Sequence, residues 1–255
     1  MERAQRTDCL IIAAGKGSRL AALGEPKPLV TLAGMTLLER VMLTVAAAGI
    51  RSFRVVTGYL GEAIERFVPA SPLLAGLDVR FVRNDEWEKA NGVSVARAAS
   101  SLGDRFVLLM SDHLFDPRIL ARLLAEPIAA DEVILAVDSR IEGHPTVDLE
   151  DVTKVRVEAG AIREIGKGIA TYNAFDTGIF LCTPALFAAL EESFRAGDFS
   201  LSGGIGRLAA RGKARVFDVG DGLWIDVDDV PAYERARALV ASGALASGAG
   251  PRPGA

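Results

Sequence analysis

The sequence predicts an α/β protein in which a mostly parallel sheet is flanked by helices and continues into a mixed β region. Strand-like and helix-like segments alternate from residue 9 to residue 137. Two of the strand-like segments, CLIIAA (9–14) and FVLLM (106–110), are wholly apolar. Such runs are typical of parallel strands buried on both faces. After about residue 140 hairpin-like patterns replace the alternation, which indicates the mixed β region.

Each element of the first half carries its own signal. Apolar residues recur at helical spacing in 36–49, and Gly49 is a good helix stop. Asp116 precedes Pro117, an N-cap residue before a first-turn proline. The expected strands are 9–14, 53–58, 79–84, 106–110 and 133–137, and the expected helices are 36–49, 61–68, 93–100 and 117–124. This β-α-β order predicts helices on both faces of the sheet.

The second half begins with alternating residues around Ala159-Gly160, which predict a hairpin over 153–167. A strand is expected at 175–182, and Thr183-Pro184 should open a helix as cap and first-turn proline. Further strands follow in 216–228, and an amphipathic helix at 230–241 closes the fold with Asp229 as its cap. No linker is visible, so we predict one domain over 1–243, with halves at about 8–140 and 141–243. The Gly/Ala/Pro-rich tail, 244–255, is predicted to be disordered.

Composition excludes several classes of protein. The 255 residues carry a formal net charge of -4 and contain no Lys/Arg run, which argues against nucleic acid as a partner. Cys9 and Cys182 lie in apolar runs and are expected to be reduced core residues. No apolar stretch reaches the ~18 residues of a membrane span, and the N-terminal apolar run is too short for a signal peptide. We therefore expect a cytoplasmic enzyme or binding protein.

A glycine loop follows the first strand in IIAAGKGSRL (11–20), and Pro26-Lys27-Pro28 comes soon after. Glycines let backbone N–H groups approach phosphates without a Cβ in the way. The loop contains no third glycine, since position 20 is leucine, and no G-x-x-x-x-G-K-[ST] run, so two familiar phosphate motifs are excluded. A tight turn would explain the glycines alone. Three cations within about a dozen residues, namely Lys16, Arg19 and Lys27, favour a triphosphate site.

Two aspartates are candidate metal ligands. Asp112 comes just past the end of strand 106–110, at the sheet edge where α/β proteins bind ligands. Asp226 lies at the end of the apolar segment LWID (223–226). Two carboxylates from distant segments suit Mg²⁺, which prefers oxygen ligands and substrate phosphates. Asp228 is expected in a solvated turn. His113 either orients a ligand or lies in an exposed loop without a specific role, and it is not expected to be a catalytic base.

Weaker signals complete the candidate site. Residues 87–94 join a strand to a helix, where Asn91-Gly92 either forms a turn or helps to read a base edge. Lys154, Lys167 and FDTG (175–178) lie in the second half, where a cation and a carboxylate could bind a second substrate carrying phosphate and hydroxyls. Solvated surface lysines are the alternative. The predicted nucleotide-binding residues are Ala13, Ala14, Gly15, Lys16, Gly17, Ser18, Asn91, Gly92 and Ser94.

These motifs together resemble the signature of the sugar-phosphate nucleotidyltransferase family, over the chain to about residue 242. The resemblance implies a Rossmann-like fold of the nucleotide-diphospho-sugar transferase type and Mg²⁺ as cofactor. It matches Arg19 and Lys27 to the catalytic cations of the family, and Asp112 and Asp226 to its metal ligands. The first half is then the nucleotide-binding half, and the second is the acceptor-binding half.

Within this family the chain looks most like the CTP:inositol-1-phosphate cytidylyltransferases. The similarity lies in K-x-N-G-x-S (89–94), S-D-H-x-F (111–115), T-K-V-R-V-E-x-G (153–160), I-G-K (165–167), D-T-G-I-F (176–180) and L-W-I-D-V-D (223–228). The implied substrates are CTP and a small phosphorylated alcohol, inositol 1-phosphate. The acceptor-binding residues would be Lys154, Lys167, Asp176 and Thr177. Some members are fused to a membrane CDP-alcohol phosphotransferase, which we expect here as a separate partner or in a longer parent chain.

Three other functions remain open from the residues. One is a phosphocholine cytidylyltransferase, which would need an aromatic cage around the quaternary ammonium group. A hexose-1-phosphate nucleotidyltransferase is the second. The third is a non-catalytic nucleotide-binding regulator, which would lack a metal carboxylate or a loop cation. The expected reaction is an in-line displacement at the α-phosphorus of the nucleotide, which requires no general base because the attacking phosphate oxygen is already ionised.

Overall fold

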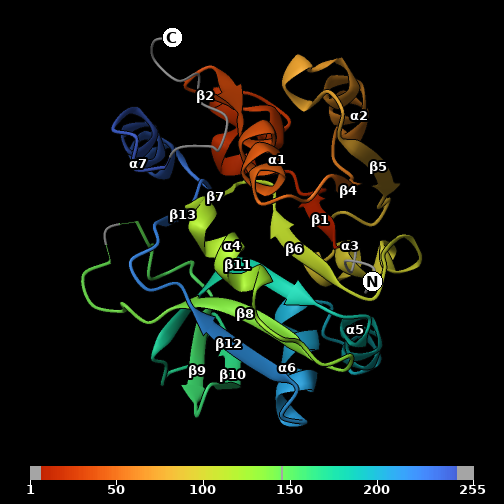
Figure 1. Cartoon of the computed structure of the whole chain (residues 1–255), viewed down its shortest axis with the longest axis vertical. Coiled ribbons are helices and arrows are strands. Elements are labelled where there is room, and N and C mark those ends of the chain that lie inside the picture. The colour runs from red at the N-terminus through yellow and green to blue at the C-terminus, as the bar shows by residue number, and fades with distance from the viewer. Residues whose placement is uncertain (1–6, 145, 246–255) are drawn as a thin grey trace, which may run out of the picture.

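The computed structural model describes residues 7–144 and 146–245. A nine-stranded sheet runs through the molecule in the order β5-β4-β1-β6-β11-β8-β12-β10-β9 (Figure 1). Its first four strands are parallel: β5 (Asp78–Arg83), β4 (Ser52–Thr57), β1 (Asp8–Ala13) and β6 (Phe106–Met110). The parallel sheet predicted for the first half is therefore confirmed. The tail was predicted to be disordered, and its residues from 246 onward lie outside the described part of the chain.

The second half of the sheet has mixed strand directions, as predicted. β11 (Ala174–Cys182) is antiparallel to both β6 and β8 (Val133–Asp138), and β12 (Ala214–Asp218) is parallel to β8. The hairpin of β9 (Lys154–Glu158) and β10 (Ala161–Gly166) forms the far end. Since the first residues of β11 also pair with β9, the sheet curls back on itself there.

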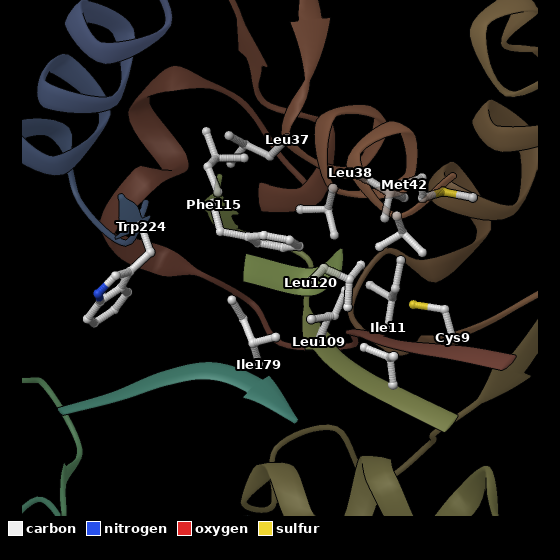
Figure 2. Packing of buried hydrophobic residues seen from close by; sticks show 14 of the residues in the cluster. Cys9, Ile11, Leu37, Leu38, Met42, Leu109, Phe115, Leu120, Ile179 and Trp224 are labelled. Atoms are coloured by element: carbon white, nitrogen blue, oxygen red, sulfur yellow. The ribbon is translucent and has the colours of Figure 1, made fainter. Parts of the chain in front are cut away.

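Helices cover both faces of the sheet, and each face has its own core. Cys9 and Ile11 of β1 pack toward α1 (Leu37–Ala47), α2 (Gly61–Ala70) and α4 (Pro117–Leu124). Leu10 and Ile12 pack toward α3 (Asn91–Arg97), α5 (Ala185–Arg195) and α6 (Leu201–Ala210). Figure 2 shows the first core, where side chains of α1 lie over those of β1 and β6. The alternation along β1 explains why its sequence is apolar throughout.

The predicted helix starts are mostly confirmed. The side chain of Asp116 accepts a hydrogen bond from the backbone N–H of Arg118 at the start of α4. Asp229 does the same from Ala232 in α7 (Val230–Ala241). The capping role predicted for Thr183 is wrong. α5 begins at Ala185, and the Thr183 hydroxyl instead donates to the carbonyl of Glu132, which ties this turn to the sheet.

Helix α6 had no counterpart among the predicted elements. Its sequence, LSGGIGRLAA, contains three glycines, which weaken the helical signal. One of them has a packing reason, because a Cβ at Gly204 would lie 2.6 Å from Cδ2 of Leu190 in α5. Glycine thus lets these two helices approach closely.

Both cysteines are free and buried, as predicted. Burial raises the pKa of each thiol far above its usual range, so neither is a reactive thiolate. No helix in the described part of the chain is long and apolar enough to cross a membrane.

Candidate active site

The glycine loop leads from β1 into the 3₁₀ helix Ser18–Leu23, and its two glycines differ in role. Gly17 has φ 60°, and a Cβ there would lie 2.5 Å from Cδ of Lys27, so glycine makes room for that side chain. Nothing lies within 4 Å of the Cβ position of Gly15, so the backbone is open to a ligand. Lys16 is exposed, with Nζ 5.5 Å from the ring centroid of Tyr59.

The remaining loop residues differ in their access to a ligand. Ala13 and Ala14 are buried, with 2% and 1% of their surface exposed, so their side chains belong to the core. The carbonyl of Ala14 accepts a hydrogen bond from the backbone N–H of Tyr59. Ser18 is exposed at the start of the 3₁₀ helix. Any nucleotide contact at positions 13 and 14 would therefore involve backbone atoms.

A short antiparallel ribbon brings the two predicted metal ligands together. β7 (His113–Phe115) pairs with β13 (Trp224–Asp226) in a register that places His113 opposite Asp226. Asp112 directly precedes β7, and the backbone N–H of Val227 donates to its carbonyl. Ligand atoms of Asp112, His113 and Asp226 all lie within 4.8 Å of one another. Two segments far apart in sequence thus form one candidate metal site.

His113 is not in an exposed loop, which was one of the two alternatives from the sequence. Its side chain is only 15% exposed, and Nδ1 lies 2.8 Å from the carbonyl oxygen of Thr177. Since a carbonyl can only accept, Nδ1 carries a proton and Nε2 faces the carboxylates, 3.3 Å from Oδ2 of Asp226 and 3.9 Å from Oδ1 of Asp112. Burial alone would lower the pKa of His113, but these carboxylates raise it to about 10.

Glycine at position 178 is what allows the imidazole to lie against β11. Gly178 has φ 73°, and a Cβ there would come within 2.5 Å of Cε1 of His113. The pairing of β11 with β8 shifts register between Asp176 and Phe180, around this residue. The irregular strand therefore makes space for the side chain that joins the carboxylates.

The residues present suit a divalent cation. Oδ1 of Asp226 is buried and has no hydrogen-bond partner among the described residues. Burial and the neighbouring charge of Asp112 raise the pKa of Asp226 to about 6. A cation between the carboxylates would satisfy the orphaned oxygen and favour the ionised form of both groups. The two carboxylates supply the oxygen ligands that such a metal prefers, and His113 could join them only after losing the proton on Nε2.

The two predicted catalytic cations lie beside this cluster. Nζ of Lys27 is 2.5 Å from Oδ2 of Asp112 and also pairs with Asp228, although the Lys27 side chain is only 6% exposed. Burial would lower the pKa of Lys27, yet the surrounding carboxylates raise it above its ordinary value. Arg19 pairs with Asp228 at 2.7 Å and with Asp151 at 2.5 Å. Both side chains are therefore positively charged, and both contact the carboxylate of Asp228.

Asp228 corrects the expectation of a solvated turn. It is shared by Lys27 and Arg19, and these cations hold its pKa below the usual range despite partial burial. The sequence contained a usable signal, because residues 226 and 228 alternate along an extended segment and so point to the same side. Asp151 carried no such signal, since nothing in its local sequence predicts its contacts with Arg19 and Lys167.

Two of the four predicted acceptor-binding residues line a cavity that extends to the candidate metal ligand Asp226. Asp176 and Lys167 line it together with Arg19, Asp226 and Asp228. Oδ1 of Asp176 accepts a hydrogen bond from the backbone N–H of Gly178 at 2.7 Å, and burial raises its pKa to about 6.

Thr177 and Lys154 do not line this cavity. Thr177 is fully buried, and its hydroxyl donates to the carbonyl of Ala136 and so is not directed to an acceptor in this cavity. Lys154 also lies outside the lining, with Nζ 3.3 Å from the carbonyl oxygen of Lys167 and 5.5 Å from the Tyr172 ring.

Asn91 is the member of its predicted group whose side chain lines the cavity. Asn91-Gly92 begins α3 rather than forming a turn, and Asn91 Oδ1 accepts from the backbone N–H of Leu201. Gly92 is a packing requirement, since a Cβ would lie 2.6 Å from the carbonyl oxygen of Phe199. Ser94 is buried and hydrogen-bonded to Asn84 Nδ2 at 2.9 Å, so its side chain does not reach a ligand in the cavity.

A buried carboxylate that the sequence did not reveal anchors the cavity wall. Asp138, fully buried at the end of β8, accepts hydrogen bonds from Trp224 Nε1 at 2.8 Å, His144 Nε2 at 2.8 Å and the guanidinium of Arg140 at 2.6 Å. Burial alone would raise its pKa, but these donors lower it to about 2. Asp138 thereby fixes the segment that follows β8 against β13, which carries Asp226.

Known proteins share this arrangement of elements. A family model described as the MobA-like NTP transferase domain matches residues 9–165. The Bifunctional IPC transferase and DIPP synthase of Rubrobacter xylanophilus is 35% identical over 246 residues, which cover 94% of this chain and 53% of that protein. The protein of the same description from Archaeoglobus fulgidus is 31% identical, with 94% and 45% covered. The chain thus spans about half the length of these relatives.

One solved structure corresponds to nearly the whole chain. The inositol-1-phosphate CTP transferase from T. maritima superposes with a TM-score of 0.79 at 28% sequence identity. The match covers 92% of this chain and 94% of that one.

Proposed function

Because this chain belongs to the MobA-like NTP transferase family, we propose that it transfers CMP from CTP to inositol 1-phosphate, giving CDP-inositol and pyrophosphate. One observation carries the proposal. A single cavity is lined by Arg19 of the glycine-loop region, by Asp226 and His113 of the candidate metal site, and by Lys167 and Asp176 of the second half. A nucleotide half and an acceptor half therefore meet where a phosphoryl-type displacement would occur. The names of the relatives and of the T. maritima structure support the choice of CTP and inositol phosphate.

In this proposal an oxygen of the acceptor phosphate attacks the α-phosphorus while the bond to the β-phosphate oxygen breaks. The attacking oxygen is already ionised near neutral pH, so the site needs no general base. Asp112 and Asp226, with His113 beside them, would hold Mg²⁺, which when bound neutralises charge on the α-phosphate. Arg19 and Lys27 stabilise the negative charge that grows at the reacting centre and on the departing pyrophosphate.

The carboxylate contacts of Arg19 and Lys27 keep these cations oriented before substrate binds. Asp228 pairs with both, so the two cationic groups are held next to the same carboxylate. Preorganised charges of this kind require little rearrangement when negative charge develops. Nucleotide phosphates can then replace part of the carboxylate contact.

The acceptor is proposed from the second-half residues. Lys167 would bind the acceptor phosphate, and the carboxyl of Asp176 would accept hydrogen bonds from ring hydroxyls. A site built for hydroxyls rejects acceptors that lack them, because its own polar groups remain unpaired. The aromatic rings lining the cavity are those of Phe180, Trp224 and His113, and the Trp224 N–H is occupied by Asp138. This lining does not resemble a cage for a quaternary ammonium, which disfavours phosphocholine.

The test offers purified protein four NTPs and a panel of acceptors: inositol 1-phosphate, phosphocholine and glucose 1-phosphate. Pyrophosphate release and chromatography of labelled products identify the reaction. We expect CDP-inositol to predominate, and Asp112→Asn to abolish release as a matched control. Predominant CDP-choline, or a sugar nucleotide formed with another NTP, would refute the acceptor assignment. A membrane CDP-alcohol phosphotransferase is the proposed consumer of the product.

A further inference from the structure

Arg235 is a cation of the cavity that has no anion beside it. The other basic side chains of the lining are paired: Arg19 with Asp151 and Asp228, Lys167 with Asp151, and His113 with Asp226. Within residues 7–144 and 146–245 the guanidinium of Arg235 has no hydrogen bond or ion pair, and its Nε is buried without a partner. One N–H of this charged group is therefore buried in the cavity wall without an acceptor among the described residues.

The helix that carries Arg235 is firmly positioned. Ala232 and Arg235, three residues apart on α7, both face the cavity. Ala236 is fully buried on the neighbouring side of the helix, and the hydroxyl of Tyr233 donates to the carbonyl of Thr31 at 2.9 Å. Arg235 is thus presented to the cavity by a fixed element.

The location indicates what the guanidinium would bind. α7 packs against the 3₁₀ helix Ser18–Leu23, which carries Arg19, as well as against β13. A buried N–H without an acceptor is costly, and its planar fork matches two oxygens of a phosphate. A substrate phosphate entering beside Arg19 would satisfy both the charge and the unpaired N–H. Among the carboxylates of the lining, Asp151, Asp226 and Asp228 are each paired with another cation.

We propose that Arg235 is a phosphate-binding residue of this site, and that it takes the oxygens of the distal phosphates of the nucleotide, which leave as pyrophosphate. The inference rests on the proposed function for the identity of the substrate. The acceptor phosphate, for which Lys167 is the proposed partner, offers the same chemistry. Contact with pyrophosphate would assist its departure in the forward reaction and its capture in the reverse reaction.

The test compares Arg235→Met, which keeps most of the side-chain stem, with Arg235→Lys, which keeps the charge but loses the fork. Arg237→Met is the matched control, because Arg237 lies on the same helix, is 60% exposed and pairs with Glu234. Each protein is titrated calorimetrically with magnesium pyrophosphate, and the KM values for CTP and for the acceptor are measured. Thermal unfolding is followed with and without pyrophosphate.

For Arg235→Met we expect pyrophosphate affinity to fall about tenfold or more, with a raised KM for CTP. Arg235→Lys should recover part of this loss, and Arg237→Met should match the wild type. The unliganded Arg235→Met protein should unfold at the same or a higher temperature, because the guanidinium has no partner to lose, while its stabilisation by pyrophosphate shrinks. A raised KM confined to the acceptor would assign Arg235 to the acceptor phosphate and overturn the choice of pyrophosphate.

Unchanged pyrophosphate affinity and unchanged KM values would overturn the proposal altogether. So would a fall in the melting temperature of the unliganded Arg235→Met protein with ligand stabilisation intact, because that pattern marks a structural role. The calorimetric arm needs no acceptor. It therefore separates this inference from the proposed function: wild-type protein that binds pyrophosphate through Arg235 but forms no CDP-inositol would refute only the latter.

Discussion

Lys27 and Asp112 form an ion pair, with Nζ and Oδ2 2.5 Å apart, inside a site where the lysine is almost completely buried. In the proposed reaction the two groups serve different partners, the lysine a phosphate and the aspartate a metal. Their pairing in the unliganded protein means that substrate and metal exchange partners with them, so neither the lysine nor the aspartate is left unpaired in the free or the bound state. This relationship connects catalysis with the stability of the site.

Replacing Lys27 should affect turnover more than nucleotide binding. Lys27→Met removes a charge that acts on the α-phosphate as it develops negative charge, so we expect kcat to fall by about 10²-fold with a smaller change in KM for CTP. Arg19→Ala should behave similarly. Lys213→Met serves as control, because Lys213 pairs with Asp131 elsewhere on the surface. A raised KM at normal kcat would reduce these residues to ground-state anchors.

The carboxylates proposed as metal ligands should be individually essential. We expect Asp112→Asn and Asp226→Asn each to lower kcat by about 10²-fold or more, because each weakens the ion that neutralises the reacting phosphate. The activity should recover partly at high Mg²⁺. Steady-state rates over a Mg²⁺ titration measure this effect, and circular dichroism checks the fold. Either variant retaining full activity in limiting Mg²⁺ would show that the residue is not a ligand.

Asp151 should restrain two substrate-binding cations. It pairs with Arg19 and Lys167, and these contacts lower its pKa, with Lys167 the larger influence. Because the pairs are largely exposed, releasing them with Asp151→Asn should lower the KM of an anionic substrate by no more than about fivefold. Raising the salt concentration should shrink the difference between variant and wild type. Asp131→Asn, which breaks a surface pair with Lys213, is the control, and an increase in KM would contradict the prediction.

Asp138 should contribute stability that depends on pH. Its pKa in the folded protein, about 2, lies below the ordinary 3.8, so its ionised form stabilises the fold above about pH 4. That contribution, about 2 kcal/mol, is lost as the pH falls from 4 toward 2. Asp138→Asn should remove this pH dependence and lower the free energy of unfolding at pH 7 by about 3–5 kcal/mol, since a neutral amide with one acceptor oxygen replaces the carboxylate shared by Trp224, His144 and Arg140. Urea denaturation at several pH values measures both effects, and an unchanged slope below pH 4 would refute the assignment.

The fold could be predicted from sequence because its local signals agree with its packing. The strand 9–14 is apolar on both faces since two cores meet it, and Asp116 and Asp229 cap the helices they precede. The glycine-rich α6 was missed because its packing against Leu190, which is a tertiary contact, outweighs its low helix propensity. Thr183 misled for the same reason, since its hydroxyl is used by the neighbouring Glu132 carbonyl.

The candidate site was predictable where single residues carry recognisable chemistry, as with Asp112, Asp226 and Lys27. Its supporting contacts were not, because they join residues that no local pattern relates. The link between Asp138 and Trp224 crosses 86 positions of sequence, and that between Arg19 and Asp151 crosses 132. Even so, the two-residue spacing of Asp226 and Asp228 shows that strand periodicity can reveal partners of a predicted ligand.

The register that sets His113 opposite Asp226 makes the β7–β13 ribbon intolerant of insertions and deletions, unlike segments that pair with no strand. Successive residues of β13 point to opposite sides, so one inserted residue would replace the Asp226 carboxylate with the apolar side chain of Ile225 or Val227. A change of length in this ribbon would therefore remove a candidate metal ligand outright and could not shift its position by a small amount. Residues 147–153, which pair with no strand, have no such register to preserve, whereas Arg140 and His144 earlier in the same connection are held by Asp138. New acceptor preferences, in natural relatives or in the laboratory, should thus arise by changing the length and composition of residues 147–153 while the ribbon and the contacts of Asp138 are left intact.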